Sequence, residues 1–241
     1  MLHKRVLNRV RSLLPLHRIQ ELERRLSRLE RRVQNRRWAA VEEIGDYLVG
    51  AQVPGDYCEF GVFKGETFAY VVNRLSPDPN LAHMRYIAFD SFEGLPPPAG
   101  IDAVDGYSSN FHAGEFGCDR STFVSNLRRE GVDMRKVEIV EGWFDQTLTD
   151  ETADRIGLKA VSAAWIDGDL YESCVPILKF LTKRISVGTI ILFDDWRVFR
   201  NLPDRGEQLA CREWLDQNPN INLLPLFSFG HHGAAFTVSS C

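Results

Sequence analysis

The chain has 241 residues, of which 44% are hydrophobic, 26% charged and 11% aromatic. These proportions are those of an ordinary globular protein, and they exclude collagen-like, fibrous and intrinsically disordered classes. The length predicts one large domain with or without a short appendage. Five scattered cysteines without a CxxC pair argue against a zinc site or a disulfide framework. Because the sequence has neither an apolar run of roughly 18 residues nor a secretory signal pattern, we expect a cytoplasmic protein.

Positive charge is concentrated near the N-terminus. Residues 1–37 contain 12 Lys and Arg against 3 Asp and Glu, whereas the remaining 204 residues have a net charge of −13. We therefore divide the chain into a basic segment, 1–37, and a main domain, 38–241. Within the basic segment, apolar residues stand alternately three and four positions apart, as in the a/d seam of a coiled coil. They are Ile19, Leu22, Leu26, Leu29 and Val33.

This basic amphipathic helix predicts pairing with a second copy, which gives a homo-oligomer, or packing on its own domain. The alternative is peripheral contact with an anionic membrane surface or a nucleic acid. Three glutamates interrupt the basic face and no aromatic residues are interleaved with it, so pairing or packing is favoured. We expect no nucleic-acid partner, because the main domain is acidic and would repel phosphates.

From residue 38 onward, strand-like apolar runs alternate with helical stretches. This alternation predicts an α/β fold with a doubly wound parallel sheet. The runs 221–226 and 233–238, joined by 227–232, predict a closing hairpin that makes the last strand antiparallel. The other expected strands are 55–61, 85–90, 137–140, 161–167 and 188–194, and the expected helices are 38–48, 68–75, 121–130, 173–181 and 207–216.

Acidic residues and glycines stand where the predicted strands end. In doubly wound sheets, ligands bind outside the carboxyl ends of the strands. Aspartate and glycine also serve as turn residues and helix caps, but five such termini together favour a binding site. The termini are Glu59-Phe60-Gly61, Asp90, Glu141-Gly142, Asp167-Gly168-Asp169 and Asp194-Asp195.

The first of these turns has two glycines four residues apart before a helix. Gly61 permits a tight turn, and Gly65 lets the start of the helix lie near a ligand. The turn has neither a complete GxGxxG pattern nor a P-loop GK[ST] ending, so it does not identify a dinucleotide by itself. Asp90 can accept hydrogen bonds from both hydroxyls of a ribose, which is compatible with either NAD or S-adenosylmethionine.

Five sequence blocks, in order along the chain, together resemble the macrocin O-methyltransferase family, the sugar methyltransferases of macrolide and aminocoumarin biosynthesis. The resemblance covers about residues 38–198. It implies a class I methyltransferase fold, which is Rossmann-like with an antiparallel terminal strand, and it implies S-adenosylmethionine and magnesium as cofactors. The blocks are CEFGVFKG (58–65), DSFEGLP (90–96), EGWFDQTL (141–148), WIDGDLYES (165–173) and FDDW (193–196).

The resemblance also implies which residues bind the cofactor. These residues lie at the predicted strand ends and in the turns that follow them. Glu59 and Gly61 are expected at the methionine end, Asp90 and Ser91 at the ribose, and Gly142 and Trp143 near the adenine. Gly65 and Asp167 complete the set.

Asp167, Asp194 and Asp195 match the carboxylates that hold magnesium in this family. Such a cluster without a cation would repel itself and raise its own pKa values. Magnesium takes carboxylates and waters as ligands and leaves positions for substrate hydroxyls, which become more acidic. Asp194 is the first candidate for the base that removes the hydroxyl proton, and His231 and His232 are the alternatives.

The expected activity is methyl transfer to a hydroxyl of a sugar or glycosylated small molecule. The segment 96–118, with its glycines, prolines and aromatic residues, is expected to form a lid over the acceptor. Trp196 stands where the family commonly has tyrosine, which leaves the acceptor open. The alternatives are methylation of a catechol-like or polysaccharide-end hydroxyl, and a non-catalytic oligomerising or membrane-associated scaffold. A dehydrogenase is disfavoured by the incomplete glycine turn and the terminal hairpin.

Overall fold

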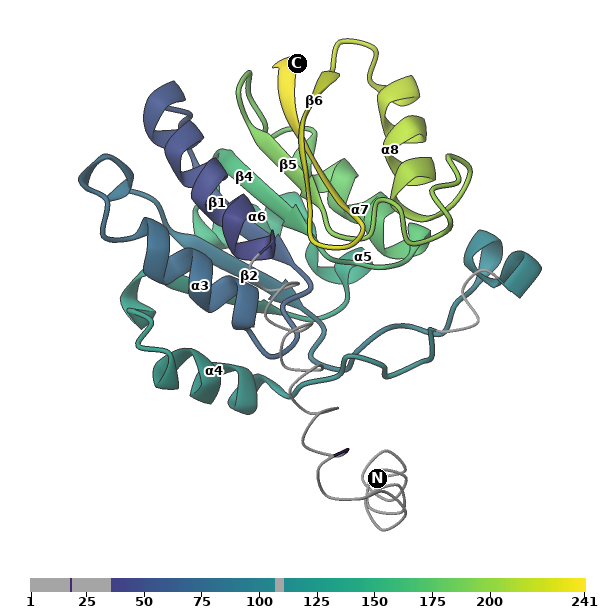
Figure 1. The fold of residues 1–241 in the computed structure, drawn as a ribbon, viewed down its shortest axis with the longest axis horizontal. Coiled ribbons are helices and arrows are strands. Elements are labelled where there is room, and N and C mark those ends of the chain that lie inside the picture. Colours follow the sequence, from purple (N-terminus) through teal and green to yellow (C-terminus); the bar gives the residue numbers. More distant parts are fainter. Residues whose placement is uncertain (1–17, 19–35, 107–110) are drawn as a thin grey trace.

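The computed structural model describes residues 36–106 and 111–241, together with Arg18. Seven strands form one sheet in the order β3-β2-β1-β4-β5-β7-β6 (Figure 1). The chain places β2 and β3 on one side of β1 and then β4 and β5 on the other, so the strand order reverses between β1 and β4. The strands are β1 (Asp56–Phe60), β2 (Tyr86–Asp90), β3 (Val137–Glu141), β4 (Val161–Ile166), β5 (Ile190–Phe193), β6 (Asn222–Phe229) and β7 (Gly233–Ser240).

The direction of the strands agrees with the prediction. All pairings among β1 to β5 are parallel, whereas β7 runs antiparallel to both β5 and β6. The doubly wound sheet with an antiparallel last strand is therefore confirmed. Because β7 lies between β5 and β6, β6 forms the edge of the sheet, and its register with β7 is irregular between Pro225 and Phe227.

Helices cover both faces of the sheet (Figure 1). Residues 36–51 are helical and pack on one face with α3 and α4, through side chains such as Val41 and Phe123. On the other face, α6, α7 and α8 contribute side chains such as Leu178 and Trp214. The helices are α3 (Glu66–Leu75), α4 (Arg120–Arg129), α5 (Phe144–Thr147), α6 (Asp150–Ile156), α7 (Tyr171–Leu181) and α8 (Gly206–Gln217), with 3-10 turns η1 (Pro79–Leu81), η2 (Gly100–Gly106) and η3 (Met134–Lys136).

The central strands are buried along their whole length. Every residue of β1, β4 and β5 is buried, as expected of parallel strands covered by helices on both faces. The rings of Phe60 in β1 and Phe89 in β2 stack with centroids 4.8 Å apart. Each such side chain stabilises the fold by about 1.5–3 kcal/mol when it is fully buried. The ends of these strands are thereby held in fixed positions.

Two helices between β3 and β4 were not predicted from the sequence. The helix α6 nevertheless has clear local signals at both ends. Thr149 caps its start, since the Thr149 hydroxyl accepts from the backbone N–H of Thr152 at 3.1 Å, and Gly157 ends it in the left-handed conformation. The predicted hairpin loop 227–232 is also longer than the observed one, because β6 continues to Phe229.

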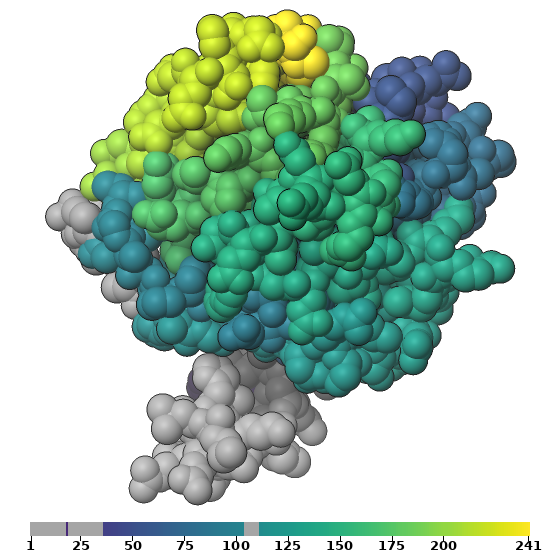
Figure 2. Space-filling model, turned by 180° about the vertical axis from the view of Figure 1, so that it is seen from behind, coloured from purple at the N-terminus to yellow at the C-terminus, as the bar shows by residue number. Residues whose placement is uncertain are grey.

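The long segment between β2 and α4 contains η2 and, in its described part, no strand or α-helix. Asp102 fastens it to α7, because its carboxylate accepts from the backbone N–H groups of Tyr171 at 3.1 Å and Glu172 at 3.2 Å. These are donors that the first turn of a helix cannot satisfy internally. Figure 2 shows the blue part of this segment lying against the green surface that includes α7.

The helix of residues 36–51 runs across the boundary predicted after residue 37. The coiled-coil seam at 19–33 lies outside the described residues, so the division into two parts, the homo-oligomer and the membrane contact stay predictions. Within the described part of the chain, no helix is both long enough and apolar enough to cross a membrane.

Two glycines provide a matched test of how α3 packs against α4. At Gly65, φ is +82° and an added Cβ would lie 2.8 Å from Phe123 Cε2, whereas nothing lies within 4 Å of a Cβ added at Gly50. We expect Gly65→Ala to lower the free energy of unfolding by about 1–3 kcal/mol. Gly50→Ala, in the helix of residues 36–51, should raise it by up to about 1 kcal/mol. Urea denaturation measures both values, and a neutral Gly65→Ala variant would contradict the packing.

Candidate active site

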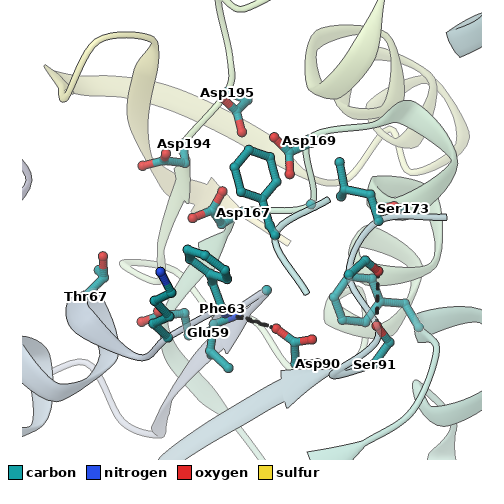
Figure 3. A pocket seen from close by; sticks show the side chains of 18 of the residues that line it. Glu59, Phe63, Thr67, Asp90, Ser91, Asp167, Asp169, Ser173, Asp194 and Asp195 are labelled. Atoms are coloured by element: carbon teal, nitrogen blue, oxygen red, sulfur yellow. Dashed lines mark hydrogen bonds between the residues drawn. The ribbon is translucent and has the colours of Figure 1, made fainter. Parts of the chain in front are cut away.

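A cavity of about 430 Å³ opens at the carboxyl ends of β1, β2, β4 and β5. It lies where the strand order reverses, which is the usual position of ligands in doubly wound folds. Its size is in the range of small-molecule sites, about 300–1,000 Å³. Figure 3 shows its acidic side chains on two sides: Asp167, Asp169, Asp194 and Asp195 on one, and Glu59 and Asp90 on the other.

Glu59 is a buried carboxyl at the end of β1. Its side chain accepts a hydrogen bond of 2.5 Å from the Tyr57 hydroxyl, and the residue is 2% exposed. Burial raises the pKa of Glu59 to about 8, and the bond from Tyr57 only partly opposes this rise. Gly61 follows at a very close approach of β1 to β4, since an added Cβ would lie 2.0 Å from the carbonyl oxygen of Asp167. Only glycine can occupy that position.

Asp90 organises the turn after β1. Its Oδ2 accepts from the backbone N–H groups of Val62 at 2.7 Å and Phe63 at 3.2 Å, and its Oδ1 accepts from that of Phe92 at 2.7 Å. Burial raises the pKa of Asp90, and these three bonds oppose the rise. The Ser91 hydroxyl donates to the Gly94 carbonyl at 3.2 Å. Both predicted ribose residues line the cavity, but their polar atoms already hold the adjoining loops.

Three carboxylates gather at the ends of β4 and β5. Asp167 follows β4, Asp194 and Asp195 follow β5, and each offers an oxygen within 4.8 Å of those of the other two. Burial and the charge of Asp194 raise the pKa of Asp167 well above its ordinary value, and burial and the charge of Asp169 do the same for Asp195. These are the shifts expected of carboxylates that are crowded together. Such a set of oxygens could hold a hard divalent ion.

Arg37 is a cation in contact with this cluster, and it was not among the site residues predicted from the sequence. Its Nη2 donates to Asp194 Oδ2 and lies 3.9 Å from Asp167 Oδ2. Burial disfavours the charged guanidinium, but the charges of Asp194 and Asp167 outweigh burial and raise the pKa of Arg37. Arg37 was counted in the basic N-terminal segment, and no local signal separates it from the other arginines there.

Two more buried carboxyls adjoin the cluster: Asp169, which was named among the strand termini but given no role, and Glu207, which was not predicted. Asp169 lines the cavity and hydrogen-bonds with Asp195, and burial raises the pKa of Asp169 to about 7. Glu207, at the start of α8, is 1% exposed, and its Oε2 accepts from the backbone N–H of Asp195 at 3.0 Å. Burial and the charge of Asp195 raise the pKa of Glu207 well above its ordinary value. Glu207 thus fixes the backbone at the end of β5.

Aromatic rings form much of the remaining wall. Phe63 and Phe116 both line the cavity, meet edge to face with centroids 5.8 Å apart, and are exposed. Phe116 and Pro96 belong to the predicted lid segment, so this segment does border the cavity. Trp143, predicted near the adenine, also lines it.

Five other candidate residues lie outside the residues that line the cavity. Gly65 faces Phe123 and Leu127 of α4, and Gly142 faces the side chain of Thr147. His231 and His232 are exposed in the turn between β6 and β7. Trp196 packs between Phe193 and Phe236, with ring centroids at 4.9 and 4.8 Å. Gly65, Gly142 and Trp196 therefore serve packing in this structure.

The raised pKa of Glu59 makes the stability of the protein depend on pH. Between about pH 4.5 and pH 8, the folded protein keeps a proton on Glu59 that the unfolded chain releases, so stability decreases as pH rises through this window. Glu59→Gln should remove this dependence and keep an acceptor for Tyr57. Relative to wild type, we expect its free energy of unfolding to be nearly unchanged at pH 4.5 and about 4 kcal/mol higher at pH 8.

Denaturant unfolding of both proteins across this pH range measures the difference. Glu43→Gln, at an exposed position of the helix 36–51, is the matched control and should leave the difference near zero at every pH. A Glu59→Gln difference that does not grow with pH would contradict the assignment.

Comparison with known proteins identifies relatives of this chain. The family model described as Macrocin-O-methyltransferase (TylF) matches residues 30–211. The 8-demethyl-8-(2,3-dimethoxy-alpha-L-rhamnosyl)-tetracenomycin-C 4'-O-methyltransferase of Streptomyces olivaceus is 32% identical over 149 residues, which are 61% of this chain and 54% of that protein. The chain spans about half the length of the curated relatives it matches.

Solved structures share the fold. The O-methyltransferase NovP superimposes with a TM-score of 0.67 at 21% identity, covering 85% of this chain and 80% of that one. An O-methyltransferase from Bacillus cereus, solved in complex with SAH, gives a TM-score of 0.55 at 14% identity, covering 84% and 81%. The sheet is therefore that of a class I methyltransferase, and the match of the family model over most of the sequence shows that this chain belongs to the Macrocin-O-methyltransferase (TylF) family.

Proposed function

We propose that this protein is an S-adenosylmethionine-dependent O-methyltransferase acting on a hydroxyl of a sugar or glycosylated small molecule. Membership of the family supports the reaction, and the Streptomyces olivaceus relative is named for 4'-O-methylation of a rhamnosyl-bearing compound. One observation carries the proposal: a single cavity places Glu59 and Asp90 opposite the cluster of carboxylates. Residues suited to a cationic nucleoside and residues suited to activating a hydroxyl therefore face the same volume.

The cofactor side of the cavity fits S-adenosylmethionine, which supplies a methyl group on a positively charged sulfur. Glu59 would face the methionine end. Asp90 uses three of its roughly four acceptor positions on backbone N–H groups and would take a ribose hydroxyl with the remaining one. Trp143 and Phe144 would provide apolar surface for the adenine ring.

Asp167, Asp194 and Asp195 would hold a divalent metal, with magnesium as the best match. The donor set fits, because it consists of carboxylate oxygens within 4.8 Å of one another, and hard oxygen ligands suit Mg²⁺ better than softer ions. A metal there would supply charge neutralisation and a lower pKa for an acceptor hydroxyl.

The acceptor hydroxyl must lose a proton as the new C–O bond forms, and two carboxylates compete for this role. Asp194 has one oxygen bonded to Arg37, while its Oδ1 is buried and has no hydrogen-bond partner among the described residues. Asp169 lines the cavity within hydrogen-bonding reach of Asp195. The geometry therefore favours Asp169 as the base and Asp194 as a metal ligand.

The exposed rings of Phe63 and Phe116 suit the acceptor class. Aromatic faces pack well against the apolar faces of sugars and against fused ring systems, and their edge-to-face pair borders the cavity. We therefore place the acceptor between this pair and the carboxylates.

Calorimetric titration with S-adenosylhomocysteine, with and without MgCl₂, tests the cofactor class. We expect binding in the micromolar range, because a cavity of this size encloses most of such a ligand. Absence of binding in both conditions would overturn the methyltransferase proposal in favour of a non-catalytic scaffold. Turnover assays with rhamnosylated, catechol and polysaccharide-end acceptors then separate the acceptor classes, and activity confined to the last two would overturn the sugar assignment.

Asp169→Asn and Asp194→Asn test the division of roles. Asp169→Asn should lower kcat by roughly 10²–10⁴-fold, because it removes the proton acceptor, and should leave the affinities for S-adenosylhomocysteine and Mg²⁺ unchanged. Asp194→Asn should weaken Mg²⁺ binding as well. The exposed Asp145→Asn is the control and should behave as wild type. An Asp169→Asn enzyme with wild-type kcat would remove Asp169 from the mechanism.

A further inference from the structure

Arg37 stands at the junction between the basic N-terminal segment and the carboxylate cluster. It lies in the first described turn of the helix of residues 36–51. Its neighbour Arg36 donates from Nη1 to the carbonyl of Gly230 at 3.3 Å, which ties the same turn to the hairpin between β6 and β7. Two consecutive arginines therefore have different partners, a backbone carbonyl for one and carboxylates for the other.

The cavity has a large excess of negative groups. Among the described residues that line it, the cations are Arg37 and Lys64. The ammonium of Lys64 lies 4.8 Å from the centre of the Phe63 ring, and the structure shows no ion pair between Lys64 and the cluster. Of these two cations, Arg37 is therefore the one that forms ion pairs with the cluster.

Asp194 offers a single oxygen, Oδ2, to a cation in the cavity, because its Oδ1 is fully buried. Its Oδ2 is the oxygen bonded to Arg37, and the same guanidinium nitrogen lies 3.9 Å from Asp167 Oδ2. A divalent ion held by the three aspartates needs Oδ2 of Asp194 and of Asp167 as ligands. The guanidinium of Arg37 already lies against these two oxygens, and its positive charge would repel the ion.

We propose that Arg37 is the internal counter-ion of the carboxylate cluster, and that its guanidinium and a divalent metal occupy the cluster alternately. This inference rests on the metal site in the proposed function. Without metal, Arg37 neutralises Asp194 and Asp167 and holds the first described turn of the helix on the cavity. Metal binding displaces the guanidinium, so that this turn loses its contact with the cluster.

Calorimetric titration of the 241-residue protein with MgCl₂, and with MnCl₂ as a second probe, tests the exchange directly. Arg37→Gln removes the competing charge, so its Kd for both ions should be at least about tenfold lower than that of wild type, which corresponds to about 1.4 kcal/mol. The melting temperature of Arg37→Gln without metal should fall below that of wild type, because buried carboxylates lose their partner. Added Mg²⁺ should narrow or reverse that difference.

Two further variants serve as controls. Arg36→Gln removes an adjacent arginine that contacts a carbonyl, and it should keep the wild-type metal affinity. Arg37→Lys keeps the charge at this position, and its Kd should lie between those of wild type and Arg37→Gln. An Arg37→Gln protein with unchanged or weaker metal binding would overturn the proposal, and so would an equal gain in affinity in Arg36→Gln.

The same samples separate this inference from the proposed function. If S-adenosylhomocysteine binds but neither wild type nor Arg37→Gln binds either ion at millimolar concentration, the exchange is wrong and the methyltransferase proposal stands. If the metal exchange is observed without S-adenosylhomocysteine binding, the counter-ion role is supported and the proposed function is wrong.

Discussion

Repulsion between carboxylates at the ends of β4 and β5 is the constraint on which the rest of the structure depends. Asp167, Asp194 and Asp195 are brought within 4.8 Å of one another by strands that the core holds rigidly. The helix of residues 36–51 offsets this repulsion with the guanidinium of Arg37. By contrast, α8 adds a further buried carboxyl, Glu207, which accepts from the backbone N–H of Asp195 and fixes the end of β5. Because crowded carboxylates repel one another, the cluster favours binding of a cation between them.

The strands fix the position of the site, and the residues in the loops that follow them supply its polar groups. The strands end at fixed points because their side chains are buried on both faces, and the residues just beyond them carry the polar groups. The turn after β1 is held by Asp90, and the segment that follows β2 is fastened to α7 by Asp102. Carboxylates therefore act here as structural anchors for loops as well as candidate ligands.

Much of this architecture could be predicted because its signals are local. Apolar runs that end in Asp or Gly identified the strands, and the same termini identified Glu59, Asp90 and the aspartate cluster. The contact of Arg37 with the cluster could not be predicted from local signals, because its partner Asp194 is distant in the sequence and the residues near Arg37 are also basic. Gly65 and Gly142 do mark close approaches, but a glycine does not reveal from the sequence whether a ligand or a side chain such as Phe123 approaches it. Glu207 has the sequence appearance of any acid in a first helical turn.

The edge strand β6 limits how this molecule can associate with others. Pro225 has no N–H to donate, and the irregular register that follows it bends the strand away from regular pairing. The exposed Leu224 and Leu226 on either side of it would otherwise invite a strand from another molecule. The β6 edge of the sheet is thus a poor template for the addition of a strand from another molecule. Regular pairing of two β6 strands across this edge is therefore disfavoured, and this leaves β3 as the other edge of the sheet.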